Sequence, residues 1–580
     1  MITPVPEAMS MTDLLRCLLA GLLLVCLAGA GDARAGVPLL HVSLTPGAEV
    51  PGGNVTHIDV GIRFETDGAG PDAPLLALAR IYANIDTVAD TMTGFSATDT
   101  LGALPLIVED EPDGLVAFRR WLPEREVSGE VRVRYRAPVT NALPARGAGP
   151  PYDLRTEGGG VSGAGGAFLV LPADGRDYRI ALRWDVSALG EEVSVSGSFG
   201  DGDVVLPAGS ASRLTRAFFM VGPLNRYQPA GEEGGRFAAA GLGDPPFDAG
   251  ELMDWTARLH AWMDDFFPAG DDAPYRVFLR HNPVNAGGGV AMINSFLVTF
   301  NETTRADGLK STLAHEMVHT WAGGLEGPDN TWFSEGIAVH YQRLLPWRAG
   351  MIGADAFLDD LNRTAARYFT NALIDTPNGE IAARFWEDTR IRVLPYDRGA
   401  MYFAVLDAWI HERSDGARSV DDLVFETILA RHEGRAMDEA DWVELLRAEL
   451  GEEGVSLHAD MMAGAVMTPP SDAFGPCFER VERDFRRFDL GFEPASLNAS
   501  PRIIRGLDPA SEAYRAGLRE GDEVLVPVPQ DAIQADQHAT LTLQVRRGDT
   551  RHTITFLPRG ETVRAPQWQH ATYNEMCGLD

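Results

Sequence analysis

Two histidines and a glutamate stand at a spacing that could bind a metal ion and activate water: His315-Glu316-Met317-Val318-His319. On an α-helix, positions i and i+4 lie about 40° apart, so both imidazoles leave the same face. Two neutral imidazoles one turn apart can bind a Zn²⁺ ion through nitrogen. Glu316 projects beside them and could act as the general base on a zinc-bound water. The pentad therefore predicts a hydrolytic site with one zinc ion as its cofactor.

A catalytic zinc also needs a third protein ligand, and two downstream residues compete for this role. Glu335 is the stronger candidate, because it opens the next expected helix, within Trp332-Phe333-Ser334-Glu335-Gly336. A helix–loop–helix arrangement would bring its carboxylate back over the two histidines. His340 lies further along the same helix and is the alternative. The ligand set that we expect is His315, His319 and Glu335.

A mixed α/β region is expected to position these residues. The pentad lies on a helix expected at about residues 307–322, and a second helix is expected to begin near Thr331. Strand-like runs precede the pentad at Tyr275 to Arg280 and Val290 to Phe300, where β-branched and aromatic residues are frequent. We expect residues 213–347 to form this catalytic α/β subdomain.

The rest of the chain changes character along its length and indicates a multidomain α+β protein. In residues 36–212, apolar residues alternate with arginines from Val131 to Arg136, which is typical of a strand with one buried face. This segment predicts an N-terminal β-sandwich-like domain. Residues 348–475 have helical patterns and predict a helical subdomain, whereas residues 476–580 return to short strands and turns. A length of 580 residues agrees with about four domains.

Residues 1–35 are expected to be a secretory signal peptide. Arg16 is a short basic region, an apolar run follows it, and Ala33-Arg34-Ala35 forms a small-x-small cleavage signal. A membrane anchor is the alternative, although the run is short for a span of about 20 residues. A lipoprotein anchored at Cys26 is another. We therefore expect an exported protein, periplasmic or secreted, with no membrane span after signal removal.

Export would leave two cysteines in the mature chain, Cys477 and Cys577. An oxidising compartment would allow these two to form a disulfide around the C-terminal segment. Two unpaired thiols are the alternative, because the sequence does not show that the cysteines meet.

The chain is strongly acidic, because 50 Lys and Arg residues stand against 83 Asp and Glu residues and give a formal net charge of -33. A field of this sign repels nucleic acid and anionic lipid, so neither is an expected partner. The composition is 45% hydrophobic and 23% charged, which is ordinary for a folded soluble protein. Acidity permits a cationic substrate or partner without requiring one.

Two segments around the proposed site resemble the gluzincin metallopeptidases, which have a thermolysin-like core. The pentad with Ser334-Glu335-Gly336 is similar to the family's HExxH helix and the SEG or NEG segment that follows it. Pro395-Tyr396-Asp397-Arg398-Gly399-Ala400 resembles the family's PYEKG segment. The resemblance implies a thermolysin-like zinc peptidase core and assigns Tyr396 to stabilisation of the oxyanion.

The C-terminal part narrows the resemblance. Asp489-Leu490-Gly491-Phe492 resembles the carboxylate-binding loop of PDZ domains, and residues 508–524 resemble the PDZ helix and turn. Such a loop would bind a peptide C-terminus through Leu490, Gly491 and Phe492. A gluzincin core between an N-terminal β domain and a C-terminal PDZ domain is the layout of the glycyl aminopeptidase family.

The strand before the pentad departs from that pattern. Related aminopeptidases have GAMEN or GGLEH there, with a glutamate that holds the substrate's free amine, but this chain has Ile293 at that position. The glycines of Gly288-Gly289-Val290-Ala291-Met292 would still let a peptide backbone approach and pair with the strand edge. We expect these five residues to bind the substrate backbone.

The expected function is zinc-dependent hydrolysis of peptide bonds in a peptide or protein substrate. The resemblance implies an aminopeptidase, whereas the missing amine anchor leaves endopeptidase action open. The alternatives are a catalytically inactive PDZ adaptor with a zinc-stabilised body, and a gluzincin that hydrolyses a non-peptide bond.

Overall fold

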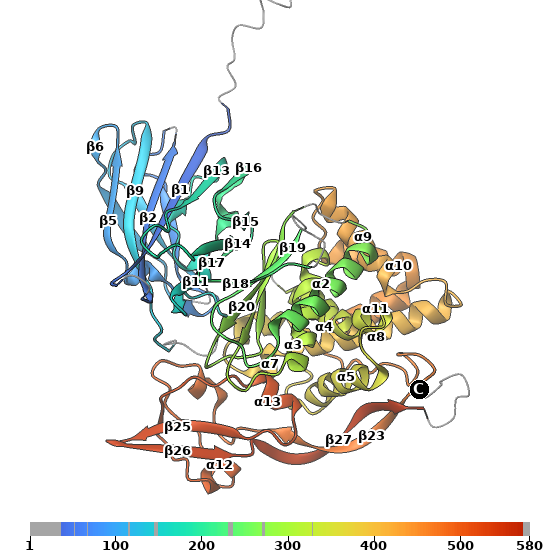
Figure 1. The fold of residues 1–580 in the computed structure, drawn as a ribbon. Coiled ribbons are helices and arrows are strands. Elements are labelled where there is room, and N and C mark those ends of the chain that lie inside the picture. The colour runs from blue at the N-terminus through green and yellow to red at the C-terminus, as the bar shows by residue number, and fades with distance from the viewer. Residues whose placement is uncertain are drawn as a thin grey trace, which may run out of the picture.

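The computed structural model describes residues 36–50, 53–66, 68–113, 116–143, 149–229, 236–269, 273–327 and 329–571. The predicted signal peptide, residues 1–35, and Cys577 lie outside the described residues. Within these ranges, no helix combines the length and the apolar character that crossing a membrane requires. The chain folds as a multidomain α+β protein with β structure at the N-terminus and helices further along (Figure 1).

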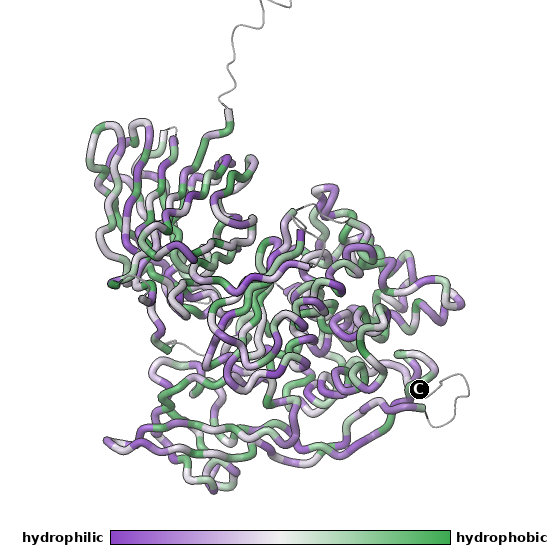
Figure 2. The backbone as a smooth tube through the Cα atoms, viewed as in Figure 1, coloured by the Kyte–Doolittle hydropathy of each residue, from purple (hydrophilic) through white to green (hydrophobic). Residues whose placement is uncertain are grey.

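The N-terminal region begins with a seven-stranded sheet in the order β16-β13-β1-β2-β9-β5-β6. Its strands are β1 (Leu39–Ala48), β2 (Val55–Glu65), β5 (Thr93–Asp99), β6 (Gly102–Ala103), β9 (Glu130–Pro138), β13 (Asp177–Trp184) and β16 (Val204–Ser210). The predicted alternation is confirmed in β9, where Val131, Val133 and Tyr135 are buried and the arginines between them are exposed. Hydrophilic and hydrophobic residues alternate along these strands because only one face meets the core (Figure 2).

Two five-stranded sheets complete the N-terminal region and share its hydrophobic core. One contains β3 (Leu76–Tyr82), β4 (Ile85–Asp86), β7 (Leu106–Asp110), β8 (Ala117–Pro123) and β12 (Leu171–Pro172). The other contains β10 (Arg155–Glu157), β11 (Gly160–Ala164), β14 (Ser194–Gly197), β15 (Gly200–Asp201) and β17 (Phe218–Gly222). Short 3-10 helices connect some of these strands: η1 (Val88–Asp90), η2 (Gly165–Ala167) and η3 (Ala211–Leu214). Because β17 pairs with both β11 and β14, the β region continues to Gly222, ten residues beyond the expected domain end at Ser212.

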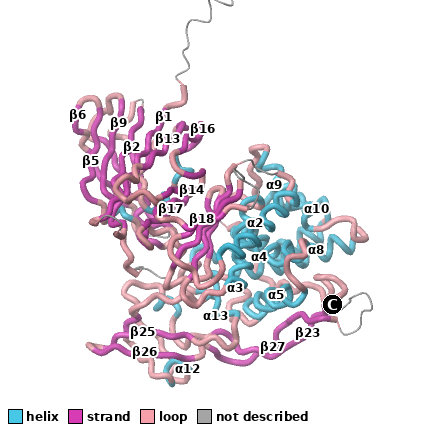
Figure 3. Tube along the Cα trace, in the orientation of Figure 1, coloured by secondary structure: helices cyan, strands magenta, loops and turns pink. Residues whose placement is uncertain are grey.

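A fourth sheet, in the order β18-β19-β20-β22-β21, lies between the N-terminal region and the helices (Figure 3). Its strands are β18 (Asn225–Tyr227), β19 (Phe237–Gly241), β20 (Tyr275–His281), β21 (Gly289–Met292) and β22 (Ser295–Phe300). The run predicted as one strand over residues 290–300 is therefore an antiparallel hairpin. Asn294 makes the turn possible, because it adopts a left-handed backbone with φ of 48°. The strand β21 forms the free edge of this sheet.

Helices pack against this sheet and against one another in one large core. They are α2 (Ala249–Phe266), α3 (Ala306–Trp321), α4 (Thr331–Arg348), α5 (Ala354–Phe369), α6 (Asn378–Arg384), α7 (Thr389–Arg392), α8 (Leu394–Arg413), α9 (Val420–His432), α10 (Glu439–Leu450) and α11 (Glu452–Met462). The predicted positions of the helix at 307–322 and of the helix that begins at Thr331 are confirmed by α3 and α4.

Helices α4 and α8 approach closely where each has a glycine. A Cβ atom on Gly336 would stand 2.5 Å from the Cα of Gly399, and one on Gly399 would stand 2.7 Å from the Cα of Gly336. Neither position has room for a side chain, because carbon atoms that are not bonded need about 3.5–4.0 Å. The two glycines therefore let the backbones touch, which brings the helix that carries Glu335 against the helix that carries Tyr396.

The C-terminal region starts with a long two-stranded ribbon of β23 (Phe478–Phe488) and β27 (Arg559–His570). Between these strands come β24 (Glu523–Val524), β25 (Leu541–Arg547) and β26 (Thr550–Phe556), with η4 (Pro494–Leu497), α12 (Glu512–Arg515) and α13 (Asp531–Ala535). The ribbon is fixed to α5, where Asn362 Oδ1 accepts a hydrogen bond of 2.7 Å from the backbone N–H of the fully buried Trp568. Figure 1 shows β23 and β27 below the helical part, whereas β25, β26 and α12 extend past it.

Candidate metal centre

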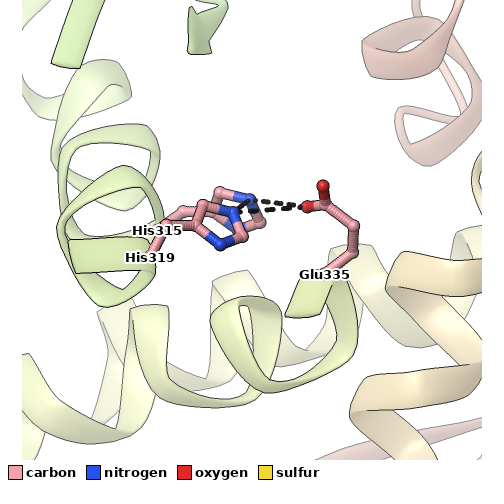
Figure 4. A group of neighbouring side chains, drawn as sticks. All are labelled: His315, His319 and Glu335. Atoms are coloured by element: carbon pink, nitrogen blue, oxygen red, sulfur yellow. Dashed lines mark hydrogen bonds and ion pairs between the residues drawn. The ribbon is translucent and has the colours of Figure 1, made fainter. Parts of the chain in front are cut away.

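The first helix after the hairpin and the helix that follows it bring three potential ligands together (Figure 4). His315 and His319 extend from α3, and Glu335 extends from the first turns of α4. The Oε2 atom of Glu335 lies 3.2 Å from Nε2 of His315 and 3.4 Å from Nε2 of His319. One ligand atom from each residue lies within 4.8 Å of the other two, so the three could hold one metal ion. Two imidazole nitrogens and one carboxylate oxygen are a donor set that suits zinc.

Charge complementarity holds this cluster together. Burial alone would raise the pKa of Glu335, but His319 and His315 outweigh burial and keep the pKa of this carboxyl well below its usual range. Burial alone would lower the pKa of His319, but Glu335 raises it above the ordinary value. The carboxylate is thus ionised and ready to bind a cation.

A polar chain behind His315 fixes the orientation of its ring. Nδ1 of His315 lies 3.1 Å from Oε1 of Gln342, and the amide Nε2 of Gln342 donates hydrogen bonds of 3.0 and 3.1 Å to Asp360. Asp360 also accepts hydrogen bonds from Arg343 and Ser311, at 2.6 and 2.5 Å. With Oε1 as acceptor, Gln342 holds the proton of His315 on Nδ1 and leaves Nε2 free to bind a metal.

Sequence analysis missed Gln342 and Asp360. One signal was present, because Gln342 stands seven residues after Glu335, two helical turns further on the same face of α4. Asp360 lies on another helix, α5, and no spacing in the sequence links it to the pentad.

Glu316 lies under the edge strand β21. Glu316 is 8% exposed. A Cβ atom added to Gly289 of β21 would stand only 2.8 Å from both Cγ and Oε1 of Glu316. Burial raises the pKa of Glu316, and His315, His319 and a backbone hydrogen bond from Ala291 oppose that rise. The predicted substrate-binding residues therefore run beside the predicted base: Gly288 comes directly before β21, and β21 contains Gly289, Val290, Ala291 and Met292.

Tyr396 reaches the same site from α8. Its ring is stacked on the ring of His315, with 6.0 Å between centroids and 16° between planes. Burial and then the charge of Glu335 raise the pKa of the Tyr396 phenol well above its usual value. The hydroxyl is therefore protonated at neutral pH and could donate a hydrogen bond.

The alternative ligand His340 lies away from the cluster. It is 4% exposed, it packs beside Tyr341 and Phe403, and burial lowers its pKa to about 3. His340 is therefore a neutral core residue.

The N-terminal region also contributes to this neighbourhood, where sequence analysis found no chemistry. Tyr152 packs with Val290 of β21 against one small hydrophobic cluster and lies 5.0 Å, between ring centroids, from Tyr82. Burial, Tyr82 and the charge of Glu316 raise the pKa of the Tyr152 phenol, while Arg216 opposes that rise. Tyr152 and Arg216 precede the pentad by 99 residues or more, and no motif marks them.

The remaining predicted residues lie in the C-terminal region. Leu490 and Phe492 are buried in a separate hydrophobic cluster, and the backbone N–H of Gly491 donates to Asp489 at 2.8 Å. Cys477 directly precedes β23, and its carbonyl accepts a hydrogen bond from the N–H of Ala571 at 2.9 Å. Its predicted partner Cys577 lies outside the described residues, so the disulfide stays a prediction.

Comparison with known proteins gives a likeness in fold. No family model matches the chain, and no curated protein matches its sequence. The chain is similar to the crystal structure of an aminopeptidase N family protein from Idiomarina loihiensis, with a TM-score of 0.62 and 15% identity, over 90% of this chain and 97% of that one. The chain therefore has the multidomain fold of that aminopeptidase N family protein.

Two further solved structures are less similar to the chain. An M1 zinc metallopeptidase from Deinococcus radiodurans has a TM-score of 0.46 and 16% identity, over 74% of this chain and 95% of that one. Leukotriene A4 hydrolase from Saccharomyces cerevisiae has a TM-score of 0.45 and 11% identity, over 77% of this chain and 72% of that one.

Proposed function

We propose that this chain is an exported zinc-dependent metallopeptidase that hydrolyses peptide bonds. The observation that carries the proposal is the convergence of His315, His319 and Glu335 beside the buried carboxyl of Glu316. Three protein ligands leave a position open for chemistry, as catalytic zinc sites require. The fold shared with an aminopeptidase N family protein supports the same class of reaction.

The roles of the residues follow from their places. His315, His319 and Glu335 would hold one zinc ion, which when bound polarises the scissile carbonyl and acidifies water. Glu316 takes the proton of the attacking water and later returns it to the leaving amine. Its raised pKa suits this exchange, because a base whose pKa lies nearer to neutral pH both accepts and releases a proton.

Tyr396 and β21 complete the arrangement. The protonated Tyr396 hydroxyl donates a hydrogen bond to the oxyanion that develops as the carbonyl is attacked. The free edge of β21 pairs with the peptide backbone and holds the scissile bond beside Glu316. Gly289 keeps that strand close to Glu316, since any larger residue would push the two apart.

The narrower assignment is to a protein like the glycyl aminopeptidases, with a C-terminal PDZ domain over residues 476–580. Its support is the resemblance of Leu490-Gly491-Phe492 to a PDZ loop and the order of the regions along the chain. Export to the periplasm or the medium rests on the signal-like residues 1–35. An inactive adaptor is disfavoured, because the chain keeps Glu316 and the whole ligand set.

The end of β21 bears on the type of peptidase. Ile293 stands where related aminopeptidases have the glutamate that binds a free amine, and it packs against the N-terminal core. No carboxylate of this strand can therefore hold a substrate ammonium group, which favours cleavage of internal bonds or of blocked peptides.

The test is cleavage of a mixed peptide library by the purified mature chain, before and after zinc removal by a chelator. We expect cleavage that stops with the chelator and returns with zinc. Fragment ends then separate stepwise trimming from internal cuts. Cleavage that continues at full rate without zinc would exclude this function.

A further inference from the structure

The N-terminal region places an arginine next to the end of the substrate-binding strand. Arg216 lies between η3 and β17, and its backbone carbonyl accepts a hydrogen bond of 2.9 Å from the N–H of Ile293. The backbone N–H of Ala291 donates a hydrogen bond to Glu316, and Ile293 lies two residues after Ala291. At about 3.3 Å per residue, the contact lies roughly 7 Å along the chain from the predicted base.

The side chain of Arg216 is a cation without a partner among the described residues. It is exposed, and it makes no hydrogen bond or ion pair with any of them. The nearby Arg213 differs, because its guanidinium donates to the carbonyl of Tyr178 at 3.1 Å. An arginine that is held in place by its backbone and has all its donors free is suited to bind an anion.

The charge of Arg216 acts on a residue that packs beside the substrate-binding strand. Tyr152 and Val290 of β21 pack against the same small hydrophobic cluster, and Arg216 opposes the rise that burial causes in the pKa of the Tyr152 phenol. Glu316 and Glu335 are the two carboxylates whose charges raise the pKa of the same phenol, and both have other roles in the proposed reaction. A substrate ammonium group would therefore meet a positive charge here and no spare carboxylate, whereas a substrate carboxylate would meet a free guanidinium.

We propose that Arg216 forms an anion-binding subsite at the Ile293 end of β21, which selects peptides with a carboxylate on the N-terminal side of the scissile bond. The direction of the peptide rests on the proposed function, in which the amine-anchor position corresponds to Ile293. The substrate class is then an acidic or acid-blocked peptide, and a free N-terminus is disfavoured.

The test compares the affinities of three peptides of one sequence, Ala-Ala-Phe-amide, with a succinyl group, an acetyl group or a free amine at the N-terminus. The amide removes the C-terminal carboxylate, which could bind in the C-terminal region. Dissociation constants are measured by titration calorimetry on the zinc-loaded mature chain with Glu316→Gln, which prevents turnover. The same chain with Arg216→Gln is the test variant, and Arg134→Gln, an exposed arginine on β9, is the matched control.

We expect the succinyl peptide to bind at least about 5-fold more tightly than the acetyl peptide at low salt, and the free amine to bind most weakly. Because Arg216 is exposed, the preference shrinks as salt rises. Arg216→Gln makes the succinyl and acetyl peptides equal, whereas Arg134→Gln keeps the preference. Two results would overturn the subsite. One is tightest binding of the free-amine peptide. The other is a succinyl preference that survives Arg216→Gln, which would mean that the carboxylate binds zinc instead.

Turnover by the chain with an intact Glu316 is measured separately. If no peptide is cleaved but the Arg216-dependent preference is present, the proposed hydrolysis fails and the subsite stands. If peptides are cleaved and the preference is absent, the subsite fails and the hydrolysis stands. Failure of all three peptides to bind overturns both.

Discussion

Replacing Gly336 by alanine tests whether the contact between α4 and α8 builds the site. The new Cβ atom would stand 2.5 Å from the Cα and 2.7 Å from the carbonyl carbon of Gly399. An ordinary contact needs about 3.5 Å or more, so the helices must separate by about 1 Å. The atoms in the way are backbone atoms and cannot rotate aside.

The expected cost follows from two opposing effects. Overpacking of a close contact costs about 1–3 kcal/mol, and a backbone contact belongs at the upper end. Alanine gains about 1 kcal/mol over glycine in a helix. The net loss is about 2 kcal/mol in the free energy of unfolding. Because Glu335 is the adjacent residue, we also expect zinc affinity to fall by about 10-fold or more.

The assay is urea unfolding of the metal-free chain, together with zinc affinity by competition with a chelating dye. Gly308→Ala is the matched control, because Gly308 lies on α3 with no atom within 4 Å of its added Cβ. That control should keep zinc affinity and lose no stability. Unchanged unfolding and unchanged zinc affinity in Gly336→Ala would refute the close-contact argument.

Three further predictions concern residues around the site. Gln342→Leu removes the acceptor for Nδ1 of His315 and should weaken zinc binding by about 10–100-fold in the same dye competition, while the fold, followed by circular dichroism, is retained; equal affinity would contradict the orienting role. His340 is neutral when folded, with a pKa lowered to about 3, so the unfolded chain binds the extra proton between pH 6.5 and 3 and stability falls as pH falls through that window. In urea unfolding of the metal-free chain, the free energy of unfolding of His340→Leu should therefore rise relative to that of the parent by up to about 1.4 kcal/mol for each pH unit below pH 6.5. A difference in stability that does not change with pH would be inconsistent with a neutral His340. Asp531 accepts a 2.7 Å hydrogen bond from Arg392 of α7, so Asp531→Ala should loosen the C-terminal region and speed its cleavage by trypsin, with no change expected for the exposed Asp549→Ala; equal cleavage rates would argue against this docking contact.

The sequence predicted those parts of the site that lie within one helix or follow it closely. The pentad implied a helix, and α3 begins and ends within one residue of the expected range. The glycines of the Ser334-Glu335-Gly336 and Pro395 to Ala400 segments were recognised as parts of motifs. Their physical role, the backbone contact between Gly336 and Gly399, became visible only in three dimensions.

Other contributors could not be predicted because they come from distant segments without periodic patterns. Tyr152 and Arg216 belong to loops of the N-terminal region. Asp360 lies on a helix with other aspartates, and no sequence pattern distinguishes it from them. The sequence predicts one strand where the structure has the hairpin of β21 and β22, because apolar residues flank the turn at Asn294 on both sides. In each case tertiary packing decides, and local propensity gives no signal.

The measurement that tests the central claim most directly is zinc content and peptide turnover of Glu316→Gln beside the parent chain. We expect one zinc ion per chain in both proteins, because Glu316 is not one of the three clustered ligands. Turnover of the variant should be lower by about 10²–10⁴-fold, the usual contribution of a general base. Turnover of Glu316→Gln equal to that of the parent, with zinc bound, would contradict the account.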